Sequence, residues 1–194
     1  MDQCSIQATE AEQYVTLEIP SELIATWKRE GYTHLHLGGI RLILTLHGRK
    51  DLPVTARLAL LDTHFKEYQH VVIGIILTTL HAGSTLLTFY LNFNLSLQDP
   101  NLPTTLKVQI QLQGAEQIIS FKMATQHYQL LYRLQNHALD LPHTSTEALM
   151  ILANTESVPT IIQIPKQDLL KLMPLEWLSN YEQFHQNSQL VQTS

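Results

Sequence analysis

The sequence predicts an all-β domain, an antiparallel β-sandwich with a short N-terminal helix and C-terminal helices. Short runs in which every second residue is apolar recur along most of the chain, and this period is typical of strands. Turn-forming segments separate the runs, and no βαβ alternation is present that would indicate a parallel sheet. Many short strands with few helices therefore favour two stacked antiparallel sheets.

The composition is that of a globular protein with few charges, 44% hydrophobic and 15% charged over 194 residues. Its net charge of −5 argues against polyanion binding by bulk electrostatics. The charges are unevenly distributed, because residues 28–66 hold seven basic and three acidic residues, whereas the rest holds five basic and fourteen acidic ones. This asymmetry indicates either a basic face or scattered solvated residues on strand surfaces, and spacing alone leaves both open.

The length suits one domain with a sizeable core, or one domain plus a small appendage. We expect a flexible N-terminus over residues 1–12, a single domain over 13–184 and a flexible tail over 185–194. The single cysteine, Cys4, excludes an intramolecular disulfide and a thiolate metal cluster and favours a reducing compartment. The polar and acidic first residues do not have the pattern of a secretory signal.

The first elements are a strand and a helix. Residues 13–19 alternate as a strand, which Pro20 ends. Ser21 is predicted as the N-cap of a short helix over 22–30, which stops at Gly31.

The next segment carries two closely spaced strands. After YTHLHL, the glycine pair Gly38–Gly39 predicts a bend or bulge, and residues 40–47 alternate as a strand. GRKDLP over 48–53 is a loop, and residues 54–61 form the following strand.

Residues 69–98 contain no Lys, Arg, Asp or Glu. A membrane hairpin is one interpretation, but polar residues interrupt the segment before about 18 apolar residues accumulate. The period-two repeat of Leu and Phe over 87–97 instead favours a buried β-hairpin that turns at HAGS.

The C-terminal half is predicted to hold further hairpins and then helices. Residues 106–113 form a half-exposed strand that is expected to pair with 116–123, and residues 127–134 suit a strand or a helix. ALMILA over 148–153 either follows a capping box or pairs with TIIQI, and the hairpin is favoured. Residues 166–184 are predicted to be helical, split by Pro174.

Catalytic and metal-binding patterns are weak. His34 and His36 share one side of a strand, as ligands of a cupin-like metal site do, but the carboxylate that should follow shortly is missing. GxSxG, HExxH and P-loop motifs are absent from the sequence, so we expect neither an enzyme nor a cofactor. Asp62, at the end of an apolar run, suits a turn-capping carboxylate or a direct binding role.

The ordered motifs of the chain resemble the 30K superfamily of plant virus movement proteins. The central match is GYTHLHLGGIRLILTLHGRKDLP followed by VTARLALLD, which ends at Asp62. IPSELIATW before it and PLEWLSNYE near the C-terminus are similar to movement proteins of the plant pararetroviruses, the caulimovirus and badnavirus relatives. The resemblance extends over roughly residues 13–184.

The resemblance implies a jelly-roll-like sandwich related to small viral capsid proteins. It implies cell-to-cell transport at plasmodesmata, by tubule assembly or by binding single-stranded nucleic acid, with Asp62 as the signature residue of transport. Candidate nucleic-acid contacts are Arg41, Arg49, Lys50 and Arg57. Expected partners are a second copy, virion or capsid components, plasmodesmal host proteins and the membrane periphery. A capsid-like structural protein, or a domesticated or degenerate endogenous viral copy, is the alternative.

Overall fold

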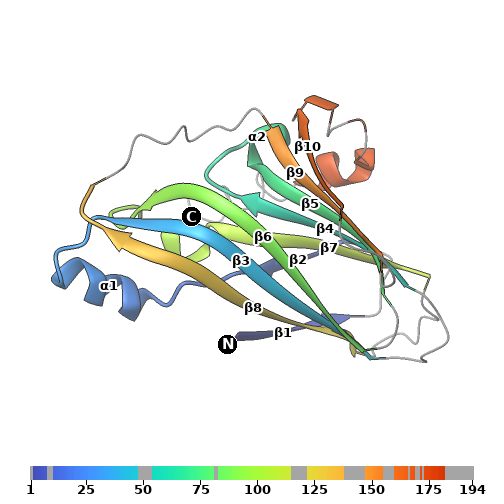
Figure 1. Cartoon of the computed structure of the whole chain (residues 1–194), viewed down its shortest axis with the longest axis horizontal. Helices are drawn as coiled ribbons and strands as arrows, with labels where there is room; N and C mark the ends of the chain where they lie inside the picture. Colours follow the sequence, from blue (N-terminus) through green and yellow to red (C-terminus); the bar gives the residue numbers. More distant parts are fainter. Residues whose placement is uncertain are drawn as a thin grey trace, which may run out of the picture.

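The computed structural model is a two-layered β-sandwich with short helical segments around it (Figure 1). It describes residues 2–7, 11–47, 54–80, 83–114, 122–137, 147–154, 160–165, 167–168, 171 and 173–181. The strands are β1 (Asp2–Gln7), β2 (Gln13–Thr16), β3 (His34–Leu46), β4 (Val54–Asp62), β5 (Val72–Leu80), β6 (Gly83–Ser96), β7 (Leu106–Gln113), β8 (Lys122–Gln135), β9 (Glu147–Asn154) and β10 (Thr160–Pro165). The helices are α1 (Ser21–Arg29), α2 (Tyr68–Val71) and the 3₁₀ turn η1 (Leu102–Thr104).

The strand order is that of a jelly roll. One sheet has four strands in the order β1-β8-β3-β6, and the other has six in the order β10-β9-β5-β4-β7-β2. The first eight strands pair as β1 with β8, β2 with β7, β3 with β6 and β4 with β5, all antiparallel, like one long ribbon folded over itself. The predicted antiparallel sandwich is therefore confirmed, with one exception, since β9 joins β5 in parallel.

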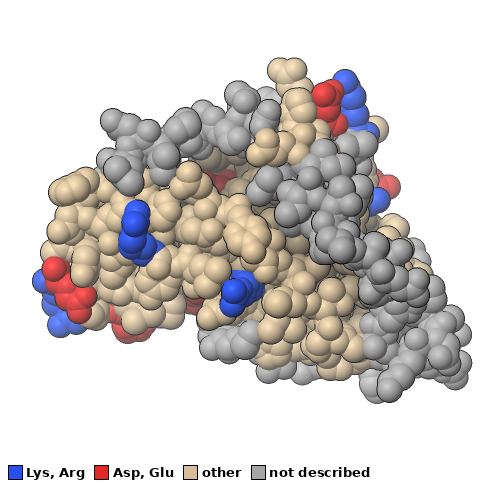
Figure 2. Space-filling model, in the orientation of Figure 1, with Lys and Arg blue, Asp and Glu red and all other residues tan. Residues whose placement is uncertain are grey.

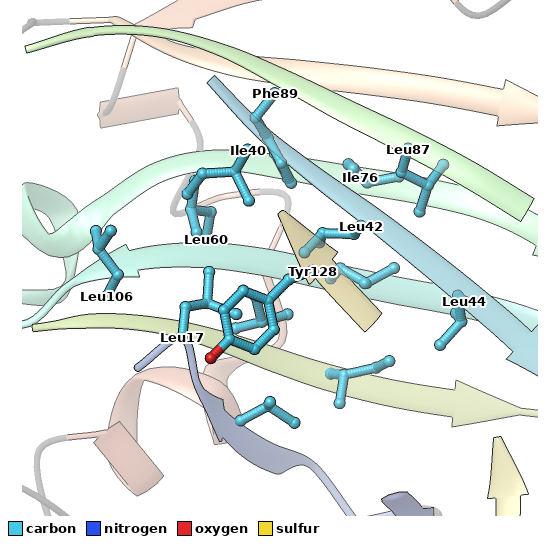
Figure 3. Close-up of a cluster of buried hydrophobic side chains, with 14 of the residues drawn as sticks. Leu17, Ile40, Leu42, Leu44, Leu60, Ile76, Leu87, Phe89, Leu106 and Tyr128 are labelled. Carbon is cyan, nitrogen blue, oxygen red and sulfur yellow. The ribbon is translucent and has the colours of Figure 1, made fainter. Parts of the chain in front are cut away.

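The main core lies between the two sheets. Ile40, Leu42 and Leu44 of β3 are fully buried and point toward the six-stranded sheet (Figure 3). Leu60 and Ile76 meet them from the opposite layer and are also fully buried. At roughly 1.5 to 3 kcal/mol for each fully buried large apolar side chain, this layer is the principal source of stability.

A second apolar cluster lies on the outer side of the six-stranded sheet. Ala59 and Leu61 of β4 point outward, yet both are fully buried. They are covered by α2 and by the C-terminal segment, where Trp177 and Tyr181 are 1% exposed. Residues 175–181 are helical, and Pro174 separates them from the helical residues before it, as predicted.

The glycine pair in β3 marks an irregularity in pairing, as the sequence predicts. The register with both β6 and β8 shifts between Leu37 and Gly39. At Gly39 a β-carbon would lie 2.9 Å from the backbone oxygen of Phe89, closer than real side chains approach. Glycine is thus required here so that β6 can pair closely with β3.

Helix α1 begins one residue earlier than expected. Pro20, with extended ψ of 128°, occupies the N-cap position, and Ser21 is the first helical residue without a side-chain capping bond. The prediction of Ser21 as N-cap is therefore wrong, because the fixed φ of Pro20 already sets the chain direction into the helix. Gly31, with φ of +89°, follows the last turn as predicted.

One predicted hairpin is wrong in its pairing. β5 and β6 do not pair with each other, since β5 lies between β4 and β9 while β6 pairs with β3 in the other sheet. Of the strand 116–123 that was expected to pair with β7, positions 116–121 lie outside the described residues, and Lys122 begins β8, which pairs with β1 and β3. In a jelly roll the chain crosses between layers, so strands that are adjacent in sequence need not be neighbours in a sheet.

Other expectations have different outcomes. Residues 2–7 form strand β1 against β8, within the segment 1–12 that was expected to precede the domain. Residues 127–134 belong to strand β8, and β9 and β10 form the favoured C-terminal hairpin. The loop 48–53 and the tail 185–194 fall outside the described residues. In the part of the chain that is described, none of the helices has the length and apolar character to span a bilayer.

Substitution of Gly39 by alanine should destabilise the fold by about 1–3 kcal/mol, because the added methyl group meets the backbone of β6. Gly38→Ala is the matched control, since its β-carbon would lie 3.6 Å from the nearest atom, an ordinary contact. Urea denaturation of both variants measures the difference. Equal loss of stability would show that the close approach at Gly39 is not the cause.

Candidate functional site at the end of strand β4

Asp62 is the last residue of β4, and its side chain is 13% exposed. One carboxylate oxygen, Oδ1, accepts hydrogen bonds from the backbone N–H of His64 at 3.1 Å and from the Thr105 hydroxyl at 3.3 Å. The same oxygen lies 2.6 Å from His64 Nδ1. The side chain therefore closes the turn after β4 and ties it to the start of β7.

His64 connects this carboxylate to a second one. Its Nε2 contacts Oδ2 of Asp99, which lies in the turn between β6 and β7. Asp99 is itself fixed, since its Oδ1 accepts the backbone N–H of Asn101 at 2.9 Å. Asp62, His64, Asp99 and Thr105 together form what we call the aspartate clamp.

The electrostatics of the aspartate clamp favour a charged imidazole. The hydrogen bond to Asp62 raises the pKa of His64 most, and Asp99 adds to the shift, while burial opposes it; the net effect brings the pKa to about 9. Burial acts to raise the pKa of Asp99, but the hydrogen bonds from Asn101 and His64 outweigh it and lower that pKa. His64 is therefore a cation between two carboxylates at neutral pH.

The turn that carries His64 also contacts the C-terminal helical residues 175–181. Tyr181 donates a hydrogen bond from its hydroxyl to the Phe65 carbonyl at 3.2 Å. Burial, and then the negative charge of Asp62, raises the pKa of this tyrosine. The end of β4, the β6–β7 turn and residues 175–181 are thus joined at one place.

The chemistry of the clamp is structural. The Thr105 oxygen lies 2.8 Å from His64 Nδ1, a distance that would suit an activated hydroxyl. However, Thr105 is 1% exposed, so a substrate cannot reach it. Within the described ranges, no group of three or more His, Cys, Asp or Glu is arranged to hold a metal ion.

Of the predicted nucleic-acid residues, the two that the structure describes, Arg41 and Arg57, lie on different sheets. Arg41 is exposed on the outer face of the four-stranded sheet. Arg57 lies on the outer face of the other sheet, where it donates to Gln111 Oε1 at 3.2 Å and stacks 5.8 Å from the Trp177 ring centre. Arg49 and Lys50 lie outside the described residues.

His34 and His36, considered as metal ligands, make local hydrogen bonds instead. His34 Nδ1 lies 2.7 Å from the Thr33 hydroxyl, and His36 Nδ1 lies 3.0 Å from Asn94 Oδ1. Both side chains are half-buried on the four-stranded sheet.

Sequence reasoning missed three members of the clamp. His64, Asp99 and Thr105 have no shared motif, because they come from segments up to 41 residues apart. Two local signals were present, since Asp-Thr-His and Asp-Pro-Asn are both sequences in which an aspartate accepts the N–H two residues later. These signals predict the two turns, but they do not predict that the turns lie side by side in the fold.

The strand order defines a jelly-roll protein, an architecture that is also found in viral capsids. The chain belongs to the viral movement protein family, because residues 3–148 match the profile "Viral movement protein (MP)". The resemblance deduced from the motifs is thereby confirmed.

The relatives are proteins of plant viruses. The chain is 44% identical over 192 residues to the "Genome polyprotein" of Petunia vein clearing virus (isolate Shepherd), covering 96% of this chain and 9% of the polyprotein. It is 25% identical over 117 residues to the "Movement protein" of Figwort mosaic virus (strain DxS), covering 54% of this chain and 36% of that one. The chain thus spans 9% of the length of the polyprotein that it matches.

Among solved structures, the chain is similar to one from Desmodium yellow mottle tymovirus, with a TM-score of 0.40 and 14% identity over 72% of this chain and 82% of that one. The assignment of the fold depends on the strand order given above rather than on this similarity.

The clamp makes stability depend on pH. Because the folded state raises the pKa of His64 above its ordinary value of 6.5, the stabilisation is complete below pH 6.5 and is lost as the pH rises through about 9. We expect the loss of stability to be of order 1–3 kcal/mol, because the His64 side chain is 28% exposed and solvent weakens its interaction with the carboxylates. Urea denaturation between pH 6 and 10 measures it.

His64→Gln should remove this dependence, whereas His70→Gln, a change at a side chain that is 47% exposed, should retain it. An unchanged pH profile in His64→Gln would contradict the role of the clamp.

Proposed function

We propose that this chain transports viral material from cell to cell through plasmodesmata of the host plant, as a non-enzymatic protein that assembles with copies of itself. The observation that carries the proposal is the match to the viral movement protein family over residues 3–148. The partners of this activity are virion or capsid components, plasmodesmal host proteins and the periphery of the membrane that lines the channel. Single-stranded nucleic acid is a second cargo.

Within this function, Asp62 acts by shaping a surface rather than by reacting with cargo. Its Oδ1 already accepts from His64 and Thr105, so it fixes the loops that leave β4 and enter β7. These loops form one end of the sandwich, where a partner would meet several segments at once.

A fluorescently tagged chain expressed transiently in leaf cells should gather in punctate foci at the cell wall. Asp62→Ala should disperse them, because three donors lose their acceptor and the end of the sandwich loosens. Asp168→Ala is the matched control, since that carboxylate is 52% exposed and pairs with the exposed side chain of Lys171 at 2.8 Å. Uniformly diffuse signal from the unmodified chain would contradict plasmodesmal action.

The contact with nucleic acid is best placed on the outer face of the four-stranded sheet. Its strands contain one acidic residue, Asp2, against the basic residues Arg41, Lys122 and Arg133. Arg41 and Arg133 are exposed, and Figure 2 shows isolated basic side chains on an otherwise largely uncharged face. A sparse set of cations supports weak, sequence-independent binding of a phosphate backbone.

This placement keeps Arg41 from the set deduced from the sequence and leaves out Arg57. Arg57 faces the opposite way and is packed under Trp177, so it cannot share a strand of nucleic acid with Arg41 on one face. The basic cluster between residues 28 and 66 is therefore divided between two layers.

Arg41→Gln and Arg133→Gln should each lower the slope of log Kobs against log salt by about 0.7, the contribution of one phosphate contact to single-strand binding. Arg57→Gln should leave the slope unchanged, because its side chain is on the other sheet. Fluorescence anisotropy with a labelled single-stranded oligonucleotide over a range of salt concentrations measures this. If Arg57→Gln alone lowers the slope, the interface lies on the six-stranded sheet.

A further inference from the structure

Strand β6 is an edge strand with unusual composition. Among the strands that the structure describes, it has a hydrogen-bonded neighbour, β3, on one side only. It is 14 residues long and contains no charged residue and no proline. Natural proteins usually protect such edges with charges, proline or short length, because an exposed edge pairs readily with another strand.

Two large apolar side chains on β6 point into solvent. Leu86 is 61% exposed and Tyr90 is 68% exposed, whereas Leu87 and Phe89 between them are buried in the core. Leu86 and Tyr90 are four residues apart, so both lie on the outer face of the strand. Thr88 is midway between them on the same face.

This spacing is self-complementary. In an antiparallel pair of two β6 strands related by a twofold axis at Thr88, Leu86 lies opposite the partner's Tyr90, and Tyr90 lies opposite the partner's Leu86. The buried Leu87 lies opposite the partner's Phe89, which continues the core side of the sheet. Pairs of an aromatic and an aliphatic residue are among those that stabilise neighbouring strands.

We propose that two copies of this chain associate through their β6 edges, antiparallel about Thr88, and so join their four-stranded sheets into one continuous sheet. This inference rests on the proposed function, for which it names the contact between copies. It does not depend on cargo, because the contact is formed by uncharged strands.

The charges of the sheet are compatible with this pairing. Arg41 of β3 is opposite Thr88, so the two arginines would be separated by three strand spacings, about 14 Å. That exceeds the screening length of about 8 Å at physiological ionic strength, so their repulsion is small. The pairing also places the basic faces of both copies on the same side of the joined sheet.

The strength of the contact is limited by its size. A single strand on each side places the interface at the low end of the range for specific contacts, below about 1,200 Å² in total. We therefore expect a weak dimer in dilute solution that is reinforced when several contacts act together. An assembly that must form and dissolve in a cell suits such a contact.

Cysteine cross-linking tests the geometry. In a Cys4→Ser background, Thr88→Cys places two thiols across the axis at the separation of directly opposed residues, about 4.5–5.5 Å between Cα atoms, which suits a disulfide. Ser84→Cys is the matched control on the same strand, because the two positions would be about 26 Å apart. Mild oxidation without nucleic acid should give covalent dimers of the first variant and not of the second.

Sedimentation of the full chain over a concentration series tests the energetics. Leu86→Lys should weaken dimerisation by about tenfold or more, since it places a charge against the partner's Tyr90. Leu175→Lys makes the same change at a leucine that is 82% exposed outside β6 and should have no effect. Circular dichroism confirms that each variant remains folded.

Equal cross-linking at both cysteines, or undiminished dimerisation of Leu86→Lys, would overturn the β6 interface. Cell-wall foci that persist in Leu86→Lys would overturn the link between this interface and transport, while leaving the proposed transport itself intact. Dimers formed by a chain that never reaches the cell wall would overturn the proposed function alone.

Discussion

The structure depends on the packing of the inward face of β3 against the inward face of β4. These strands follow each other in sequence, yet each lies inside a different sheet, with a neighbour on both sides. Leu35, Leu42 and Leu44 on one strand and Leu58 and Leu60 on the other are fully buried. Every later strand of the ribbon finds its place by pairing beside one of these two, so their mutual packing defines the spacing of both layers.

The alternation of apolar residues predicted which side of each strand faces the core, but it did not predict which strands are neighbours. β5 and β6 were recognised as strands from their period, and a hairpin was inferred because the turn between them is short. Alternation is satisfied equally by a hairpin and by a crossing between layers, since both bury the same side chains. Gln109 shows a related limit, because it lies on the polar side of the strand predicted to be half-exposed, yet it is fully buried, and Tyr68 donates a hydrogen bond to it at 2.7 Å.

The aspartate at the end of β4 shows how a sequence motif can mark a structural junction. The sequence located Asp62, but its partners His64, Asp99 and Thr105 became visible only when the fold brought the β6–β7 turn beside it. An ionised carboxylate accepts several hydrogen bonds and donates none, which suits a position surrounded by a backbone N–H, a protonated imidazole and a hydroxyl. Asparagine has nearly the same shape and is polar, but it lacks the negative charge that holds His64 protonated. Its amide group would also present N–H donors where the carboxylate only accepts, so it would not replace Asp62.

The two outer faces of the sandwich differ in what covers them, and this asymmetry is the basis for placing the proposed contacts. On the six-stranded sheet, Trp177 and Tyr181 cover Ala59 and Leu61, and Arg57 turns its guanidinium toward the indole ring rather than toward solvent. Covering this face removes its arginine from the set available to a phosphate backbone, because a cation stacked on an aromatic ring and bonded to Gln111 is already partly desolvated. On the four-stranded sheet, Arg41, Leu86 and Tyr90 remain exposed in the described part of the chain. The C-terminal segment therefore acts as more than a stabilising layer, since by occupying one face it leaves the other as the face on which the proposed cargo and neighbouring copies would bind.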